Sequence, residues 1–327
     1  MSKVHKILVV GAGQLGSRHL QALSKIALPV EIEVLDPFPA SLTVARSRFD
    51  EMLPNPLVQG VRYLSDAEGV STHIDFAIVA TNADVRADVV RALLGRGEIR
   101  HMLLEKVLFQ KLADHADIRA LFELHGVKAW VNHPRRMFPV YQEVRAWLAG
   151  AREVSYQLNG GGWGLACNGL HFIDHLAFLT GEQNLVLSGA GLHDTTIPSK
   201  RQGFIEFSGA LHGRLGPHPF ALHCHAEPAP VLLTVSSEQA SLVVDEAKGS
   251  VRFATKEGGW TWTERLEKIV RFQSELSHLV AQDVLGTGRC ALPTYAEAVR
   301  LHVPFLRCLL DKLAQVDGRQ YDACPIT

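Results

Sequence analysis

The chain has 327 residues, more than one ordinary hydrophobic core accommodates, so we expect two domains. Its composition, 47% hydrophobic and 20% charged with a formal net charge of -1, is typical of a globular protein and excludes a disordered one. The 33 basic residues balance the 34 acidic ones, which argues against nucleic acid as a partner because phosphate binding normally needs a basic excess.

The sequence does not indicate a membrane or secreted protein. No segment approaches the roughly 20 consecutive apolar residues of a membrane span, and the first apolar run is too short for a signal peptide. The five cysteines are odd in number and contain no C-x-x-C pair, so neither a disulfide framework nor a zinc site is predicted. We therefore expect a cytoplasmic protein.

The first predicted element is a buried parallel strand over residues 6–10, followed by a glycine turn and a helix over 17–26. The turn reads Gly11-Ala12-Gly13-Gln14-Leu15-Gly16. In such a turn the first glycine permits the tight bend, the second lets a diphosphate approach the backbone, and the third lets the helix pack closely on the strand. Free N–H groups at the start of the helix would hold the phosphates.

A second strand is predicted over residues 30–35 and ends in Asp36, twenty residues after Gly16. A carboxylate at this place can accept hydrogen bonds from the ribose hydroxyls of NAD and would repel the 2'-phosphate of NADP, so NAD is the expected cofactor. The alternative is that Asp36 only opens the turn over residues 36–39. The order of strand, glycine turn, helix, strand and acid favours the nucleotide site.

Two later strands are expected to end at the same edge of the sheet. Residues 74–80 lead to Thr81 and Asn82, and residues 101–104 lead to Glu105 and Lys106. Ligands of open α/β sheets bind at the carboxyl ends of the strands, so these four residues are candidate cofactor contacts. A fifth strand ends near residue 132. We place the domain boundary there, with a Rossmann domain over 1–132 and a substrate-binding and oligomerisation domain over 133–327.

These residues resemble the Gfo/Idh/MocA family, which includes glucose-fructose oxidoreductase and inositol dehydrogenase. The resemblance is carried by the glycine turn, by Ala80-Thr81-Asn82, by Glu105-Lys106 and by Asn168-Gly169-Leu170-His171-Phe172-Ile173-Asp174. It implies an α/β protein with an N-terminal Rossmann domain and a C-terminal α+β domain built on a large, mostly antiparallel open sheet. It also implies hydride transfer between a nicotinamide and a hydroxyl or carbonyl carbon of a sugar or sugar derivative.

The resemblance makes Lys106 a catalytic residue. In the family this lysine belongs to a Glu-Lys-Pro motif and lies beside the nicotinamide, and here Val107 replaces the proline. A partly buried lysine near a positively charged ring has its ammonium form disfavoured, which suits acid/base work. The alternative is a surface lysine paired with Glu105.

The last marker usually reads Asp-x-Gly-x-His-x-x-Asp in the family. His171 and Asp174 match its later positions, so the resemblance implies that His171 handles the proton with Lys106 and that Asp174 orients the histidine. Cys167 stands where the first aspartate is expected. A thiol does not supply the charge or the hydrogen-bonding capacity of a carboxylate, so the proton relay must differ or be absent.

Five residues are candidate substrate contacts: Arg135, Arg136, Trp163, Cys167 and Asn168. The arginines follow the domain boundary and would either hold an anionic group or form a solvated basic turn. The run 160–164 is too glycine-rich for a packed strand, so we expect a loop that brings Trp163 to a ligand. The alternative for Trp163 is a buried anchor of the domain.

Short alternating segments recur at residues 154–158, 185–192, 204–211, 221–225, 231–235 and 242–244. They predict antiparallel strands with one covered face and one free face, and hence a homodimer or homotetramer formed through the sheet. His223 and His225 share a strand face but lack a carboxylate partner, so no metal site is predicted. Helices over 266–285 and 295–313 are interpreted as packing elements.

Three functions follow from this interpretation. The first is an NAD-dependent dehydrogenase acting on a sugar, and the pairs 163–164 and 167–168 resemble members associated with bacterial surface-polysaccharide and sugar-nucleotide metabolism. The second is an enzyme that keeps NAD bound and recycles it during elimination or glycoside cleavage. The third is a non-catalytic NAD-binding regulatory protein, which Cys167 supports.

Overall fold

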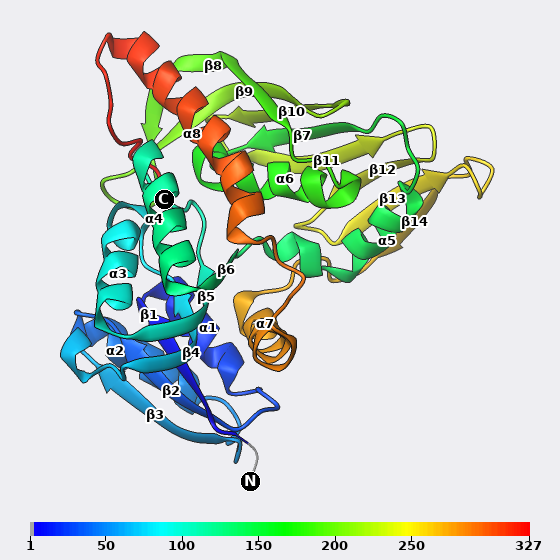
Figure 1. Ribbon diagram of the computed structural model, residues 1–327. Coiled ribbons are helices and arrows are strands. Elements are labelled where there is room, and N and C mark those ends of the chain that lie inside the picture. The colour runs from blue at the N-terminus through cyan, green and yellow to red at the C-terminus, as the bar shows by residue number, and fades with distance from the viewer. Residues whose placement is uncertain (1–2) are drawn as a thin grey trace. The chain divides into compact units, whose positions relative to one another are not determined.

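The computed structural model describes residues 3–327, which form two compact units (Figure 1). The first unit consists of residues 3–109, Ala113–Pro134 and Arg271–Ala296. The second consists of Gln110–Leu112, Arg135–Val270 and Glu297–Thr327. The chain changes from one unit to the other at Pro134, close to the expected boundary, and later returns to the first unit.

The first unit is built on a parallel sheet of six strands in the order β3-β2-β1-β4-β5-β6. The strands are β1 (His5–Val10), β2 (Val30–Leu35), β3 (Val58–Leu64), β4 (His73–Val79), β5 (Glu98–Leu104) and β6 (Lys128–Val131). The central strands β1 and β4 are almost continuously apolar because both of their faces are covered. This is the doubly wound arrangement that the sequence predicts, and the fold class is confirmed.

Four helices that connect these strands, and one helix from later in the chain, pack with the sheet (Figure 1). They are α1 (Gln14–Leu23), α2 (Pro39–Asp50), α3 (Ala83–Arg96), α4 (Leu112–His125) and α7 (Gln273–Thr287), with a 3-10 turn at η1 (Ala67–Gly69). A parallel pair of strands needs such a crossover, since a hairpin can join only antiparallel strands. The glycine turn between β1 and α1 and the ends of β4 and β5 therefore meet at one edge of the sheet.

The helix α7 packs with the first unit although it lies far along the chain. Ser277 of α7 places its hydroxyl oxygen 2.7 Å from Nδ1 of His19 in α1, and both side chains are buried. The division predicted from the sequence assigns this segment to the second domain. The residues before it, Thr263–Leu266, form strand β14 rather than the start of the helix.

The second unit is built on an eight-stranded sheet in the order β14-β13-β12-β11-β7-β10-β9-β8. The strands are β7 (Ser155–Gly161), β8 (Leu185–Pro198), β9 (Ile205–Leu215), β10 (His218–His225), β11 (Ala229–Ser236), β12 (Ala240–Asp245), β13 (Ser250–Thr255) and β14 (Thr263–Leu266). Every neighbouring pair is antiparallel except β7 and β10. The expected large, mostly antiparallel sheet is confirmed.

Three helices belong wholly or mainly to this unit: α5 (Pro139–Trp147), α6 (Leu165–Thr180) and α8 (Tyr295–Asp317). The helix α6 is apolar along most of its length and lies against β9 and β10 (Figure 1). Along β12, buried Ala240, Leu242 and Val244 alternate with half-buried neighbours. One face of the sheet is therefore core, and the other is partly open to solvent.

The prediction that residues 160–164 are too glycine-rich for a packed strand is wrong for the first two glycines. Gly160 and Gly161 belong to β7 and pair with Cys224 and His225 of β10. A Cβ atom on Gly161 would lie 2.0 Å from the carbonyl oxygen of Glu227. Glycine is present there because the neighbouring backbone approaches too closely for any side chain.

Candidate functional site

The glycine turn gives each of its three glycines a different structural role. Gly11 has a φ of +86°, in the left-handed region that favours glycine. At Gly16 a Cβ atom would lie 1.6 Å from the carbonyl oxygen of Gly11, so glycine is what lets α1 approach the turn. At Gly13, in contrast, a Cβ atom would meet no atom of residues 3–327 within 4 Å. The turn is closely packed at two glycines and open at the third.

Asp36 directly follows β2 and is buried beside this turn. Its Oδ2 accepts a hydrogen bond from the backbone N–H of Ala12 at 2.6 Å, and its Oδ1 accepts one from the N–H of Phe38 at 2.9 Å. The second bond is the turn-opening role considered from the sequence, while the first fastens the carboxylate to the glycine turn. A carboxylate offers about four lone-pair positions, so Asp36 retains capacity for hydroxyl donors.

Thr81 and Asn82 follow β4 at the carboxyl edge of the sheet, and Asn82 is the N-cap residue of α3. The Thr81 hydroxyl oxygen is buried, and within residues 3–327 it has no hydrogen-bond partner. Buried polar atoms without partners are rare in native proteins and call for an explanation such as a ligand. Thr81 also adjoins the glycine turn, since a Cβ on Gly11 would lie 2.9 Å from its backbone nitrogen.

Sequence patterns did not single out Arg86, yet it is one of the largest fully buried side chains. Its guanidinium donates hydrogen bonds to the backbone carbonyls of Thr81 and Val107, and to that of Leu108 at 2.9 Å. A signal was available, because α3 buries one helical face. That face consists of Ala83, Arg86, Ala87, Val90, Leu93 and Leu94. A cation at such a position indicates a buried role.

Glu105 at the end of β5 points into the first unit. Its Oε1 lies 2.9 Å from Nε2 of His19 and also accepts a hydrogen bond from the side-chain amide of Asn132. Burial raises the pKa of the carboxyl, but the bonds from His19 and Asn132 and the charge of Lys106 outweigh burial and lower the pKa below its usual value. Glu105 is therefore a buried, bonded anion rather than a surface partner of the lysine.

Lys106 follows Glu105 and is half-buried. The peptide bond between Lys106 and Val107 is cis, and the Val107 side chain is buried. Lys106 belongs to the first unit, and His171 belongs to the second.

In the second unit, Arg136 and Asp174 form a buried ion pair. Nε and Nη2 of Arg136 donate to the two carboxylate oxygens of Asp174 at 2.9 and 2.7 Å. Burial raises the pKa of Asp174 to about 6, although Arg136 opposes the rise. From the sequence, Asp174 is expected to orient His171 and Arg136 to contact the substrate. In the structure these two residues are instead bonded to each other. His171 itself is half-buried on the same helix, α6.

Arg135 forms a second pair of the same kind. It donates through Nε and Nη2 to Glu246 at 2.9 and 2.6 Å, and the Tyr141 hydroxyl donates to the same carboxylate at 2.6 Å. The guanidinium carbon lies 4.2 Å from the ring centre of Phe172. A cation already paired with a carboxylate attracts an anionic ligand weakly, so this geometry does not favour the anion-binding role.

Two cavities gather most of the predicted substrate residues. One of about 350 Å³ is lined by Arg135, Trp163 and Asn168 together with Phe172 and Glu246. The other, of about 410 Å³, is lined by Trp163, Cys167 and Asn168. Trp163 and Asn168 therefore border both. The indole N–H of Trp163 donates to the carbonyl of His223 at 3.0 Å, which fixes the ring.

Cys167 lies in the first turn of α6, and its thiol donates to the carbonyl oxygen of Thr327 at 2.6 Å. Glu206 of β9, which sequence reasoning missed, accepts hydrogen bonds from the N–H of Ala166 at 2.8 Å and from that of Cys167 at 3.3 Å. A carboxylate at a helix N-terminus is stabilised by the free N–H groups there. The second unit thus holds a negative charge beside Cys167, supplied by a different strand.

The sequence of residues 5–133 matches a known family, described as an oxidoreductase family with an NAD-binding Rossmann fold. This is the Gfo/Idh/MocA family, and the match covers less than half of the chain. The match covers the glycine turn, Asp36, Thr81 and Lys106, and it confirms the resemblance stated from the sequence. Among curated proteins no sequence matches the chain.

Solved structures resemble the chain over nearly its whole length. An oxidoreductase from Agrobacterium radiobacter in complex with NAD+, L-tartaric acid and magnesium has a TM-score of 0.69, 15% identity, and coverage of 96% of this chain and 97% of its own. UDP-N-acetylglucosamine 3-dehydrogenase GnnA from Acidithiobacillus ferrooxidans has a TM-score of 0.70 and 13% identity. The similarity covers 96% of this chain and 100% of that protein.

The transcriptional regulator Gal80p from Kluyveromyces lactis is similar to the same extent. Its TM-score is 0.70, with 14% identity and coverage of 96% of this chain and 93% of its own. At these identities the likeness shows a common fold. Because both dehydrogenases and a regulator share that fold, function has to be argued from the residues of the site.

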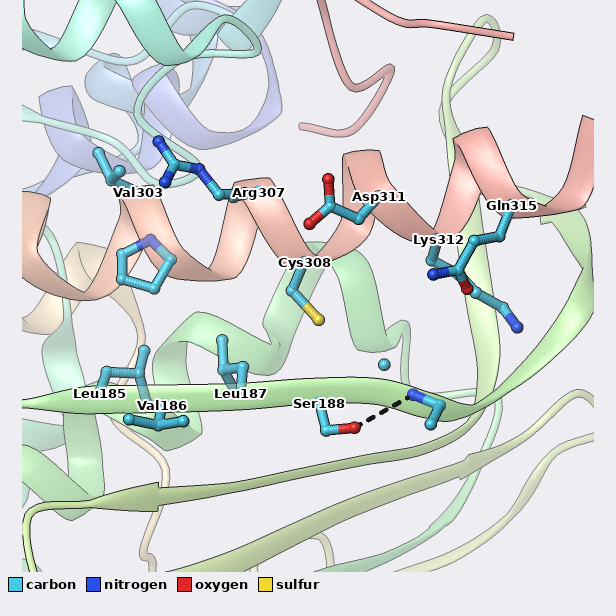
Figure 2. A pocket seen from close by; sticks show the side chains of 13 residues that line it. Leu185, Val186, Leu187, Ser188, Val303, Arg307, Cys308, Asp311, Lys312 and Gln315 are labelled. Atoms are coloured by element: carbon cyan, nitrogen blue, oxygen red, sulfur yellow. Dashed lines mark hydrogen bonds between the residues drawn. The ribbon is translucent and has the colours of Figure 1, made fainter. Parts of the chain in front are cut away.

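Outside these sites, a cavity of about 480 Å³ lies between β8 and α8 in the second unit (Figure 2). Figure 2 shows Cys308 of α8 pointing toward β8, with Arg307 and Asp311 on the same helix. None of the residues that the Gfo/Idh/MocA resemblance singles out lines this cavity. We therefore do not assign the site to it.

No group of three or more His, Cys, Asp or Glu side chains within residues 3–327 is arranged to hold a metal ion. In the same range no helix combines the length and apolar character needed to cross a membrane.

Proposed function

We propose that the protein is an NAD-dependent oxidoreductase that transfers hydride between the nicotinamide and a hydroxyl or carbonyl carbon of a sugar or sugar derivative. The observation that carries the proposal is the shape of the glycine turn, closed at Gly11 and Gly16 and open at Gly13. The residues fit a dinucleotide, because Gly13 leaves room for a diphosphate, Asp36 retains acceptor capacity, and the buried Thr81 hydroxyl lacks a partner among residues 3–327.

NAD is proposed over NADP because of Asp36. Its carboxylate is held in place by the N–H groups of Ala12 and Phe38, so it cannot easily move aside. A fixed negative charge beside the ribose would repel a 2'-phosphate, while its remaining lone pairs suit two ribose hydroxyls.

In this proposal Lys106 holds or releases the proton of the reacting hydroxyl. When bound, the nicotinamide supplies the hydride acceptor or donor. Glu105, fixed by His19 and Asn132, keeps a negative charge at the strand end that carries the lysine.

His171 is proposed as the second proton-handling group, as the family resemblance implies. Asp174 is engaged by Arg136, so we propose that the ion pair, rather than Asp174 alone, fixes this part of α6. Cys167 does not replace the missing aspartate chemically. Glu206 supplies a carboxylate at this turn, bonded to the N–H groups of Ala166 and Cys167.

A sugar is the proposed substrate class. The cavity of about 350 Å³ combines aromatic side chains, Trp163 and Phe172, with the paired charges of Arg135 and Glu246. Apolar rings and hydrogen-bonding groups in one cavity suit a ring that carries both C–H faces and hydroxyls. The similar fold of a UDP-N-acetylglucosamine dehydrogenase agrees with a sugar nucleotide as one candidate.

The proposal is tested by following the absorbance of reduced nicotinamide while the protein is given NAD+ and a panel of sugars and sugar nucleotides. A substrate-dependent rise supports a dehydrogenase. Product formation without net reduction would instead show that NAD is recycled within each turnover. Neither change, in protein that binds NAD+, would contradict the proposed reaction.

A second candidate function, an NAD-binding regulator without chemistry, is favoured by Cys167 in place of the aspartate. Gal80p shows that a protein of this fold can be a transcriptional regulator. This candidate predicts NAD binding that survives substitution of Lys106 and no turnover with any member of the panel.

We also propose that two or four copies associate through the partly open face of the eight-stranded sheet. Half-buried residues alternate with core residues along β10 and β12, which leaves one face without a full cover. Light scattering should give the mass of a dimer or tetramer. A monomer at working concentration would contradict this part of the proposal.

A further inference from the structure

We propose that Arg86 is a positioning residue for the nicotinamide end of the site. It lies behind Thr81 and Lys106 in the first unit and fastens the backbone that carries them. The inference rests on the proposed function, because it assigns the nicotinamide end to these two residues. It adds a residue that neither the motifs nor the family description singles out.

The guanidinium of Arg86 joins two segments that the chain delivers separately. On one side it donates to the carbonyl of Thr81, at the end of β4. On the other it donates to the carbonyls of Val107 and Leu108, just beyond Lys106 at the end of β5. Five N–H donors in one rigid plane let a single arginine serve both segments. One side chain therefore ties together the two segments that follow β4 and β5, in addition to the backbone pairing of the strands themselves.

The position of this cation is energetically costly. Arg86 is 1% exposed, and burying a charge is unfavourable unless hydrogen bonds replace its water. It also lies in the first turn of α3, at the end of the helix where the dipole disfavours positive charge. An apolar side chain of similar length would fill the space without these costs. The three carbonyl bonds are what the arginine adds.

The carbonyls that Arg86 holds flank the groups that face the proposed nicotinamide end. Thr81 also carries the buried hydroxyl that lacks a partner within the described range, residues 3–327. Lys106 immediately precedes Val107, whose carbonyl is bound. The adenosine end is different, because Asp36 is fixed by the N–H groups of Ala12 and Phe38. Loss of Arg86 should therefore disturb one end of the dinucleotide site and spare the other.

The experiment compares two probes, ADP-ribose and NADH, in titrations of the full-length Arg86→Met variant. ADP-ribose reports on the glycine turn and Asp36, and NADH adds the nicotinamide. We expect ADP-ribose affinity within about twofold of the wild type and NADH affinity about tenfold weaker, the effect of losing one charged hydrogen bond. The fluorescence of bound NADH should also shift toward that of free NADH.

Two further variants complete the design. Arg91→Met, on the same helix, removes a surface arginine that pairs with Asp88 and Asp114, and it should match the wild type with both probes. Arg86→Lys keeps the charge but carries its donors on one nitrogen, so it cannot join both segments and should also lose NADH affinity.

Each outcome decides the inference. Selective loss of NADH affinity in either Arg86 variant supports it. Wild-type NADH affinity and fluorescence in folded Arg86→Met would overturn it while leaving the proposed function intact. Equal loss of both probes in both Arg86 variants would show that Arg86 serves folding, and would also overturn it. A wild-type protein that binds neither probe would overturn the proposed function, and this inference with it.

Discussion

The two units treat their buried polar groups differently. In the six-stranded unit, Asp36 retains acceptor capacity beside an open glycine turn, and the Thr81 hydroxyl has no partner among residues 3–327. In the eight-stranded unit, by contrast, Arg135 and Arg136 are each bound through two hydrogen bonds to a carboxylate of the same unit. Asp36 and Thr81 thus keep bonding capacity for a ligand, while the charges of Arg135 and Arg136 are used within their own unit.

This difference affects how far a motif can be interpreted. At Gly11 and Gly16 a side chain would collide with the neighbouring backbone, so the turn requires glycine at both positions. A pair of arginines can bind a ligand, face solvent or pair with carboxylates of the protein, and Arg135 and Arg136 pair with carboxylates. Residue type alone therefore assigns function more safely in the first unit than in the second.

The largest expected effect concerns the ion pair between Arg136 and Asp174. Replacing Asp174 with leucine leaves a largely buried arginine unpaired and should lower the free energy of unfolding by about 3–5 kcal/mol, measured by denaturant titration. The double variant Arg136→Met/Asp174→Leu removes both charges and should recover most of that loss. If the Asp174→Leu variant kept full stability but lost turnover, Asp174 would act in catalysis. That result would contradict the view that the arginine and carboxylate charges of the second unit serve its structure.

The variant Lys106→Ala tests whether the first unit carries a catalytic residue. If Lys106 transfers a proton, turnover should fall by about a hundredfold or more, while NAD+ affinity and thermal stability change little. Lys25→Ala, at an exposed lysine of the same unit, is the control and should behave as the wild type. An unchanged rate in the Lys106 variant would remove the catalytic assignment.

Two glycine variants separate packing from ligand binding within one turn. Gly16→Ala places a Cβ atom 1.6 Å from the Gly11 carbonyl oxygen and should cost stability, by about 1–3 kcal/mol, through overpacking. Gly13→Ala meets no atom of the described residues, so its melting temperature should match the wild type. Its NAD+ affinity should nevertheless fall by about tenfold, because the new methyl group occupies space that the diphosphate needs. Equal NAD+ affinity in Gly13→Ala and the wild type would contradict the assigned role.

Much of the first unit could be predicted from sequence because its signals are local. The apolar run of β1, the glycine turn and the acid after β2 each depend on a few adjacent residues. The elements that the patterns did not indicate have weak signals for a physical reason. The helix α2 buries only Ala45, and the edge strand β3 has no fully buried residue.

The rest depends on contacts between distant parts of the chain. Glycine at position 161 is required by the approach of the Glu227 carbonyl, sixty-six residues later in the sequence. The partners of Arg136 and Arg135, and the packing of Ser277 on His19, are likewise long-range. Such contacts follow from the folded arrangement and leave no periodic signal in the sequence. Arg86 is intermediate, because its place on the buried face of α3 was open to inference.

A further expected effect is a change in the pH dependence of stability in the second unit. Burial lowers the pKa of His175 to about 3, so as the pH falls below the usual 6.5 the unfolded chain binds a proton that the folded protein does not, and stability falls. Burial raises the pKa of Asp174 to about 6, against the usual 3.8. Between these values the folded protein binds the extra proton, and stability rises as the pH falls.

These two contributions oppose each other between pH 6 and 3.8. The variant His175→Phe removes one of them and leaves the other. Its free energy of unfolding should therefore increase relative to the wild type as the pH is lowered from 6 toward 3.8, by up to about 1.4 kcal/mol per pH unit. Parallel curves for the two proteins across this range would contradict the assignment of a buried, neutral His175.

The central claim is that the first unit binds NAD through the open glycine turn and Asp36. Calorimetric titration of the folded protein with NAD+ and NADP+ tests it most directly. The account predicts saturable binding of NAD+, with NADP+ at least about tenfold weaker because Asp36 repels the added phosphate. Tighter binding of NADP+, or no binding of either nucleotide, would contradict it.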